Sequence, residues 1–393
     1  RLWYDESVEL ILLHSVLVNR GSGKILNKHL RAEAILEKPV RVQDSLMIAK
    51  AILAENIAPA RIDIGRLNSE WTDEHAKYGD NVSDFVRDKL KEFINAEPRS
   101  KKTQDVVLYG FGRIGRILAR ELAEMAGNGS HLRLRAIVTR KISQDDILKR
   151  ISLLRTDSVH GYFHGVCYPL WEENAMMING QKVVFIEAKN PEDVDYESFG
   201  IKDALVIDNT GVFRDREALS RHLQAKGVAK VLLTAPGKGD IPNVVYGVNQ
   251  NDLDLKNEKV FSAASCTTNA IVPGLEVMMN NFGIVKGHIE TIHSYTNDQN
   301  LLDNYHKKER RGRSAAMNMV ITETGAGSAA AKALPELKGK LTSNAVRVPT
   351  PDVSLAVLAL DVERETTVEE VNQAFRSASL KGNLIEQIRY SKS

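Results

Sequence analysis

One cysteine stands where a nucleophile could act. Cys266 occurs in the run Ser265-Cys-Thr-Thr-Asn269, directly before the predicted helix Thr268–Asn280. The positive end of a helix dipole stabilises a thiolate, which is the reactive form of the side chain. An imidazole nearby would complete a nucleophile–base pair, and His293, near the end of the predicted strand Gly287–Ser294, is the best candidate. A lone cysteine is otherwise more often a small core residue, as Cys167 is predicted to be.

Three glycines form a candidate phosphate-binding turn. Gly110, Gly112 and Gly115 make a GxGxxG pattern between the predicted strand Asp105–Tyr109 and the predicted helix Arg113–Met125. This strand–turn–helix context makes the pattern specific. The first glycine permits a tight turn, the second lets backbone approach a pyrophosphate, and the third lets the helix pack on the strand. The helix N-terminus then offers N–H groups to the phosphates. A turn that serves packing alone is the less favoured interpretation.

The end of the next predicted strand, Leu132–Val138, bears on the choice of dinucleotide. An acidic residue there usually accepts hydrogen bonds from the adenosine ribose. This chain has Thr139 and Arg140 instead. Thr139 could bond a ribose or a phosphate, and Arg140 could pair with a 2′-phosphate or simply face solvent. The residues therefore leave NAD and NADP open, with NADP favoured.

Composition narrows the class of protein. The chain has 393 residues, of which 43% are hydrophobic and 26% charged, as in ordinary globular proteins of two or three domains. A net charge of +2 gives no reason to expect nucleic acid or a membrane surface as partner. No apolar run approaches the roughly 18 residues of a membrane span. Two cysteines without an export signal indicate a reducing cytoplasm, and they cannot make a cysteine-based zinc site, so we expect no metal.

The elements that must position these residues fall into three predicted regions. Residues 1–100 are predicted to be a helical extension, residues 104–264 an NAD(P)-binding Rossmann domain, and residues 265–393 an α+β catalytic domain. In the extension we expect helices at Val8–Val18, Lys24–Glu37, Asp44–Glu55 and Ser83–Ile94 (with Ser83 as N-cap), an extended segment at Ala60–Leu67, and a linker at Asn95–Gln104.

The remainder alternates strands and helices, which is typical of a parallel α/β sheet. Further strands are expected at Ala204–Ile207, Lys230–Leu233 and Asn243–Tyr246, with a helix at Asp215–Ala225. After Cys266, the longer predicted strands Asn344–Val348 and Leu355–Asp361 indicate a second domain with a more open sheet.

At this point the motifs match a known family. They are Tyr109-Gly-Phe-Gly-Arg-Ile-Gly-Arg116, Asp157-Ser-Val-His-Gly161, Asn209-Thr-Gly-Val-Phe213, Ala264-Ser-Cys-Thr-Thr-Asn269, Asn281-Phe-Gly-Ile-Val285 and Arg347-Val-Pro-Thr-Pro-Asp-Val353. Together they resemble glyceraldehyde-3-phosphate dehydrogenase from about Gln104 to the C-terminus. The first hundred residues resemble the extension of a long bacterial form of that enzyme.

The resemblance implies a phosphorylating aldehyde dehydrogenase of glycolysis or gluconeogenesis that acts on a sugar phosphate and inorganic phosphate. Cys266 would attack the aldehyde, His293 would act as base, and a thioester would form and then be released by phosphate as an acyl phosphate. The cofactor would be NAD or NADP, and the protein a cytoplasmic homotetramer with no nucleic acid or membrane partner.

The resemblance also implies two sets of binding residues. The set for the substrate phosphate and inorganic phosphate is Ser265, Thr267, Thr296, Arg313, Thr324, Gly325 and Arg347. The set for the cofactor is Gly110, Gly112, Arg113, Ile114, Gly115, Thr139, Arg140, Thr210, Gly211 and Thr234. Arg313 belongs to a basic run from Lys307 that could be only a solvated loop. Arg347 stands in a predicted strand between two valines and needs an anion or a carboxylate as partner.

Two features keep alternatives open. Asp298 stands where some family members have a threonine, and a carboxylate there repels a substrate phosphate unless a cation intervenes. The same stretch, through Asp303-Asn-Tyr-His306, is similar to erythrose-4-phosphate dehydrogenases. The family's closing Asn-Glu-aromatic-Gly-Tyr motif does not occur before Ser393, so we expect a fragment. A catalytically inactive scaffold relative is the remaining alternative, disfavoured by Cys266 and His293.

Overall fold

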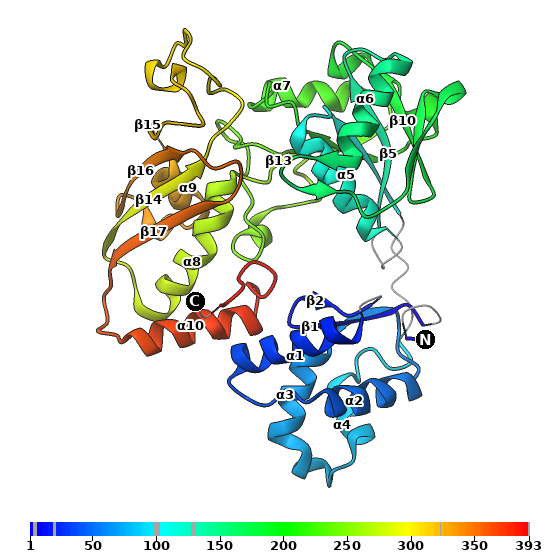
Figure 1. Cartoon of the computed structure of the whole chain (residues 1–393), viewed down its shortest axis with the longest axis vertical. Coiled ribbons are helices and arrows are strands. Elements are labelled where there is room, and N and C mark those ends of the chain that lie inside the picture. The colour runs from blue at the N-terminus through cyan, green and yellow to red at the C-terminus, as the bar shows by residue number, and fades with distance from the viewer. Residues whose placement is uncertain (3–5, 19–20, 97–102, 127–130, 323, 392–393) are drawn as a thin grey trace. The chain divides into compact units, whose positions relative to one another are not determined.

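The computed structural model describes residues 1–393 except 3–5, 19–20, 97–102, 127–130, 323 and 392–393 (Figure 1). The chain divides into two compact units. The first comprises Arg1–Thr103, Met125–His131 and Arg376–Ser393, and the second Gln104–Glu124 and Leu132–Phe375. Most of the linker predicted at Asn95–Gln104 lies outside the described residues.

A small sheet forms one part of the first unit. Its strand order is β2 (Ser15–Val16), β1 (Val8–Leu12), β3 (Ala60–Asp63), with β1 antiparallel to β2 and parallel to β3. The helix predicted at Val8–Val18 is therefore wrong. A short apolar run has no periodicity that separates helix from strand, and here the chain reverses at Leu13 and His14.

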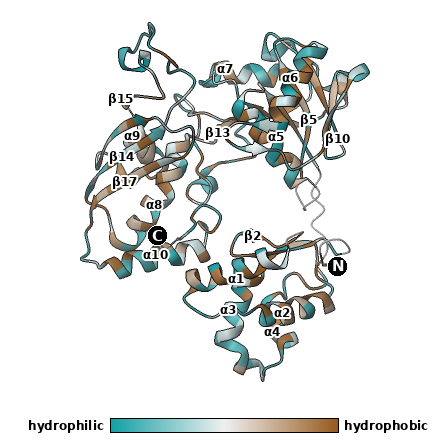
Figure 2. Cartoon of the chain, in the orientation of Figure 1, coloured by the Kyte–Doolittle hydropathy of each residue, from teal (hydrophilic) through white to brown (hydrophobic). Residues whose placement is uncertain are grey.

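Helices supply the rest of the first unit's core. They are α1 (Ser22–Leu36), α2 (Val42–Ala54), α3 (Ile64–Glu74) and α4 (Val82–Lys89), with a 3₁₀ turn at His75–Tyr78. α1 and α2 carry both hydrophobic and hydrophilic residues in Figure 2, as amphipathic helices do. Trp71 and Phe85 meet edge to face with centroids 5.2 Å apart, and Phe85 is fully buried.

Two boundaries in this unit differ from prediction because side chains cap the helices. The extended segment expected at Ala60–Leu67 ends at Asp63, whose carboxylate accepts hydrogen bonds from the backbone N–H groups of Gly65 and Arg66 and so begins α3. The last predicted helix has Asn81 and not Ser83 as its N-cap, so α4 begins at Val82, and it ends at Lys89 rather than Ile94.

The second unit contains an eight-stranded sheet. Its order is β13 (Val260–Ser262), β12 (Val228–Leu233), β11 (Ala204–Asp208), β4 (Gln104–Tyr109), β5 (Leu132–Thr139), β10 (Gln181–Glu187), β9 (Ala175–Ile178) and β8 (Cys167–Leu170). The first six strands are parallel to their neighbours, and β9 and β8 are antiparallel. The chain leaves β4 for β5 on one side and reaches β11 on the other, which makes the carboxyl end of β4 a topological switch point.

Both faces of β4 are buried. Val106 and Leu108 belong to one hydrophobic cluster, and Val107 and Tyr109 to another on the opposite face. The associated helices are α5 (Arg113–Met125), α6 (Gln144–Arg155) and α7 (Arg216–Ser220). Smaller elements are the ribbon of β6 (Thr156–Asp157) and β7 (Gly161–Tyr162) and 3₁₀ turns at Trp171–Glu173, Pro191–Asp193, Glu197–Phe199, Arg221–Gln224, Gln250–Asp252, Glu309–Gly312 and Pro335–Leu337.

The strand predicted at Asn243–Tyr246 is wrong apart from one isolated bridge between Asn243 and Ser262. The side chain of Asn243 instead bonds the backbone of Gly237 and Ile241. Local side-chain to backbone bonds of this kind compete with strand pairing.

A second sheet follows Cys266. Its order is β15 (Val320–Thr322), β16 (Leu341–Val348), β14 (Lys286–Ser294) and β17 (Ser354–Asp361), with β14 parallel to β16. The helices are α8 (Cys266–Phe282), α9 (Ala326–Ala333) and α10 (Val368–Leu380). α8 and α9 share one hydrophobic cluster with Leu358 and Leu360 of β17, so one face of this sheet is covered.

We predict that Asp63→Ala loosens the turn before β2 and the start of α3 together. The Asp63 carboxylate also accepts a 3.0 Å hydrogen bond from the Leu13 N–H, so the substitution removes acceptors from three backbone donors. We expect a loss of about 1–3 kcal/mol, measured as faster amide hydrogen exchange at these three positions. Asp73→Ala, which removes only an exposed partner of Lys38, is the control. Unchanged exchange in Asp63→Ala would contradict this role.

Candidate active site

Cys266 is the first residue of α8 and is exposed. Ser265 caps this helix, because its hydroxyl accepts a 2.9 Å hydrogen bond from the Thr268 N–H. Ala264, just before the cap, has a left-handed backbone with φ of 60°. Such a conformation costs a non-glycine residue about 1–2 kcal/mol, and strain of this kind gathers at functional sites. The local chain thus presents the thiol at the open, electropositive end of a helix.

His293 lies beside the residue that follows Cys266. Its Nε2 is 3.4 Å from the Thr267 hydroxyl, and its Nδ1 is 3.2 Å from the Ser354 hydroxyl of β17. Burial lowers the pKa of His293 below 6.5, and the positive charge of Arg347 lowers it further. The imidazole is therefore neutral at neutral pH and can accept a proton.

Arg347 pairs with His293 across β14 and β16. Its Nη1 donates a 2.9 Å hydrogen bond to the carbonyl of Ser294, whereas its Nε is buried without a partner among the described residues. Burial and the cation of Arg311 lower the pKa of Arg347, while Asp298 and Cys266 oppose that shift. A half-buried guanidinium beside a second cation favours an anion.

Arg311, which sequence analysis did not single out, lies at the same site. Its guanidinium contacts the Asp298 carboxylate and donates a 3.0 Å hydrogen bond to the Thr322 hydroxyl. The Thr296 hydroxyl donates to the other oxygen of Asp298. Burial alone would raise the pKa of Asp298, but hydrogen bonds from Thr296 and Arg311 hold it below the ordinary value. The cation needed to offset Asp298 is therefore present.

Arg313 lies differently from Arg311. It pairs with Asp303 at 3.1 Å, and its side chain is 66% exposed, against 16% for Arg311. The structure brings Arg311, and not Arg313, to Asp298 and Arg347. Both arginines stand in one basic run, and only the bend of the chain through the 3₁₀ turn distinguishes them.

Two further predicted residues lie at the start of α9. Gly325 is its N-cap, and the Thr324 hydroxyl accepts a 3.2 Å hydrogen bond from the Ala326 N–H. α9 packs with α8 in one cluster, so two helices of the catalytic domain begin near predicted anion-binding residues.

The glycine-rich turn connects β4 to α5. Gly110 has φ of 93°, which favours glycine, and a Cβ on Gly115 would lie 2.5 Å from the carbonyl oxygen of Gly110. Around Gly112 nothing lies within 4 Å of an added Cβ, so its backbone is open to a ligand. Arg113 and Ile114 are exposed at the start of the helix. The turn has the shape that a pyrophosphate needs.

A cavity of about 400 Å³ lies over this turn. Its lining includes Gly110, Gly112, Thr139, Thr210 and the cations Arg140, Arg150 and Lys189, and none of the described lining residues is acidic. The Thr139 hydroxyl is already bonded to the Lys141 carbonyl at 3.0 Å. The hydroxyl hydrogen of Thr139 is therefore not free to bond a ribose.

Asp208 positions residues beside this cavity through hydrogen bonds. It is fully buried and accepts hydrogen bonds from the N–H and the hydroxyl of Thr210 at 2.8 and 2.7 Å. Its other oxygen lies 3.0 Å from Nε2 of His222. Its carbonyl accepts the N–H and hydroxyl of Thr234, and Gly211 follows with φ of 67°. Asp208 therefore holds two of the predicted cofactor residues, Thr210 through its carboxylate and Thr234 through its backbone carbonyl.

The described residues give no support for a metal site or a membrane-spanning helix. Among the described residues no group of three or more His, Cys, Asp or Glu side chains could hold a metal ion. No helix in the described part of the chain is long and apolar enough to cross a bilayer.

Fold and site together define a Rossmann-type dinucleotide-binding domain joined to an α+β domain that presents a thiol. Comparison with known proteins gives the particular family. Residues 104–216 match the NAD-binding domain of glyceraldehyde 3-phosphate dehydrogenase, and residues 265–393 match its C-terminal domain. The chain belongs to the glyceraldehyde-3-phosphate dehydrogenase family.

Individual relatives agree. A glyceraldehyde-3-phosphate dehydrogenase-like protein of Pseudomonas aeruginosa is 48% identical over 380 residues, covering 96% of this chain and 82% of that protein. The chloroplastic glyceraldehyde-3-phosphate dehydrogenase A of Zea mays is 45% identical over 286 residues (72% and 68%), and the Zymomonas mobilis enzyme 40% over 290 residues (73% and 82%). Because it covers 96% of this chain, the Pseudomonas match includes most of the first hundred residues.

We predict that Gly115→Ala and Gly112→Ala separate packing from ligand binding. Gly115→Ala should lower both the melting temperature and the affinity for a nicotinamide dinucleotide, because its Cβ meets backbone. Gly112→Ala should lower affinity at unchanged melting temperature, because only a bound pyrophosphate would meet its Cβ. Thermal melts and dinucleotide titration by fluorescence check both. Full affinity in Gly112→Ala would show that the backbone does not approach the phosphates there.

Proposed function

We propose that this chain oxidises glyceraldehyde 3-phosphate to an acyl phosphate, with Cys266 as nucleophile and reduction of NADP or NAD. The proposal rests on the arrangement of one thiol, one imidazole and two arginines. An exposed thiol begins α8, and a neutral imidazole lies beside the next residue. Arg347 stands opposite that imidazole in the sheet and close to Arg311, and the Nε of each arginine has no partner among the described residues.

The chemistry follows from these groups. His293 takes the thiol proton of Cys266, the thiolate attacks the aldehyde carbon, and the same proton passes to the carbonyl oxygen as the C–S bond forms and the C=O π bond breaks. His293 accepts that hydroxyl proton as the carbon gives up its hydride, which leaves a thioester. The bound nicotinamide supplies the hydride acceptor. Inorganic phosphate then attacks the thioester carbon and expels the Cys266 thiolate, which yields the acyl phosphate.

Anion binding is assigned in two places. Arg347 and Arg311, with Thr296, would hold the phosphate of the substrate, since guanidinium forks suit phosphate oxygens. Ser265, Thr267, Thr324 and Gly325 would serve the attacking phosphate. We do not propose Arg313 as a phosphate ligand. Its exposed side chain pairs with Asp303, which supports a structural role.

NADP is the favoured cofactor. Arg140 alone carried this preference in the sequence, and the cavity lining adds Arg150 and Lys189. A 2′-phosphate has about two negative charges at neutral pH, so three cations with no lining carboxylate favour it over a bare ribose.

A homo-oligomer is also proposed. Leu355 and Val357 of β17 are 58% and 48% exposed, and Met317 and Met319 are 87% and 70% exposed. Leu355 and Val357 lie on one face of β17, and an exposed apolar face is a candidate interface.

The first prediction concerns the nucleophile. Cys266→Ser should lower phosphate-dependent turnover roughly a thousandfold or more, because a hydroxyl is far less ionised than a thiol. Cys167→Ser is the matched control: burial raises the pKa of Cys167 to about 11, so its thiol stays protonated and turnover should persist. Turnover is measured as dinucleotide reduction with glyceraldehyde 3-phosphate and, in parallel, erythrose 4-phosphate. Surviving turnover in Cys266→Ser would show that Cys266 is not the nucleophile, and no turnover of either sugar phosphate by the unaltered chain would favour the scaffold alternative.

The second prediction concerns cofactor choice. Arg140→Ala combined with Arg150→Ala should lower kcat/KM for NADP by about tenfold or more, since hydrogen bonds to charged groups are worth about 1.5–3 kcal/mol. The value for NAD should change less than threefold by the same reasoning, because NAD carries no 2′-phosphate. Lys141→Ala, an exposed neighbour outside the cavity, is the control. Equal losses with both dinucleotides would remove the basis for an NADP preference.

A further inference from the structure

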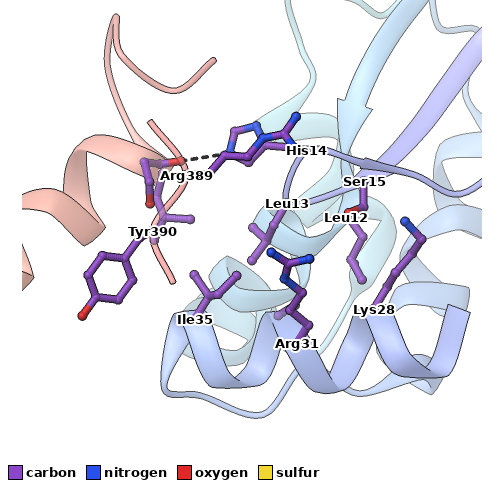
Figure 3. A pocket seen from close by; sticks show the side chains of 12 residues that line it. Leu12, Leu13, His14, Ser15, Lys28, Arg31, Ile35, Arg389 and Tyr390 are labelled. Carbon is purple, nitrogen blue, oxygen red and sulfur yellow. Dashed lines mark hydrogen bonds between the residues drawn. The ribbon is translucent and has the colours of Figure 1, made fainter. Parts of the chain in front are cut away.

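The first unit contains a cavity that the proposed reaction does not use. It lies between the turn that joins β1 and β2, helix α1, and the segment 379–390, and Figure 3 shows it from close by. Its volume is about 50 Å³. A water molecule occupies roughly 30 Å³ in the liquid, so this space suits one phosphoryl group and not a whole nucleotide.

Basic side chains dominate the charge of this cavity. His14, Lys28, Arg31 and Arg389 line it, and none of the described lining residues is acidic. In Figure 3 these side chains come from three separate segments: the β1–β2 turn, α1 and the C-terminal segment. Arg31 and Arg389 are exposed, so an anion can reach them without deep burial. Guanidinium groups brought together repel one another, and a phosphate between them relieves that repulsion.

Carboxylates on the neighbouring segments are engaged elsewhere. Glu37, at the end of α1, forms an ion pair with Arg376. Glu33 accepts a hydrogen bond from the Val40 N–H at 3.3 Å. Asp63 accepts from the Leu13 N–H and caps α3. These acids therefore have other partners, and the lining keeps its excess of positive charge.

The backbone of the turn supplies an independent observation. Leu13 and His14 have φ of 41° and 69°, a left-handed conformation that such hairpin turns normally give to Asn and Gly. Leu13 is held there by burial in the hydrophobic core and by its bond to Asp63. His14 Nε2 lies 3.1 Å from the Ser379 carbonyl, which places the imidazole at the rim. A strained turn that carries a basic ring into a basic cavity points to a ligand.

We propose that this cavity binds the phosphoryl group of a small phosphorylated molecule or free inorganic phosphate, held by Arg31 and Arg389 with His14 at the rim. Both kinds of ligand present the same phosphate oxygens to the site. The site is independent of the proposed dehydrogenase activity, because all of its residues belong to the first unit.

The test uses calorimetric titration of the full chain carrying Arg347→Ala, which weakens anion binding at the candidate active site. Inorganic phosphate and glycerol 3-phosphate are the two probes. Arg31→Gln and Arg389→Gln should each weaken binding at least about tenfold, the loss expected for a charge-assisted contact. Lys24→Gln, an exposed control on α1 outside the cavity, should change affinity less than about twofold. Tighter binding of glycerol 3-phosphate identifies a phosphate ester as the ligand, and equal binding identifies the free ion.

Two results would overturn the proposal: no saturable binding of either probe, or equal losses in Arg31→Gln and Lys24→Gln. A second measurement needs no change at Arg347. Phosphate should shift the NMR signals of the His14 ring, assigned with His14→Gln, and Arg31→Gln should abolish that shift. An unmoved signal rejects the site. Turnover of Arg31→Gln and Arg389→Gln without the change at Arg347 keeps a failure of this site distinct from a failure of the proposed catalysis.

Discussion

The register of β14 between β16 and β17 is the constraint on which the candidate active site depends. It sets His293 opposite Arg347 on one side and opposite Ser354 on the other. Side chains alternate between the faces of a sheet, so a slip of one residue would send the imidazole to the opposite face. The hydrophobic cluster that α8 and α9 form with this sheet opposes such a slip, because it would expose apolar side chains such as Ile289.

The charges around His293 are a second constraint on the candidate active site. Burial and then the charge of Arg347 lower the pKa of His293, which favours the neutral imidazole, and burial and then the charge of Arg311 lower the pKa of Arg347. Asp298 offsets part of this charge while it holds Thr296 and Arg311. In the proposed reaction Arg347 would bind an anion and also lowers the pKa of the proposed base, so its substitution should affect both binding and proton transfer.

Local patterns made much of this arrangement predictable. The strand–GxGxxG–helix unit and the cysteine at a helix start depend on neighbours in sequence. The helix Arg113–Met125 has the expected bounds, and the strands on either side of it are each one residue longer than predicted. Arg311 was not predictable, because nothing in its basic run distinguishes it from Arg313 until the chain folds. The helix expected at Val8–Val18 failed for a related reason: pairing with β3, some fifty residues later, decided its structure. Long-range pairing overrides local preference where the apolar pattern is ambiguous.

The distance along the chain between the site's parts has a consequence for folding. Arg347 and the Ser294 carbonyl that it bonds are 53 residues apart. Closing such a loop costs entropy before any contact compensates for it, so non-local pairings of this kind form late. The parallel pairing of β14 with β16 also requires α9 as its crossover. During synthesis the Cys266 thiol therefore emerges well before its imidazole and arginine neighbours are in place, and the order of folding would determine when this proposed nucleophile can react.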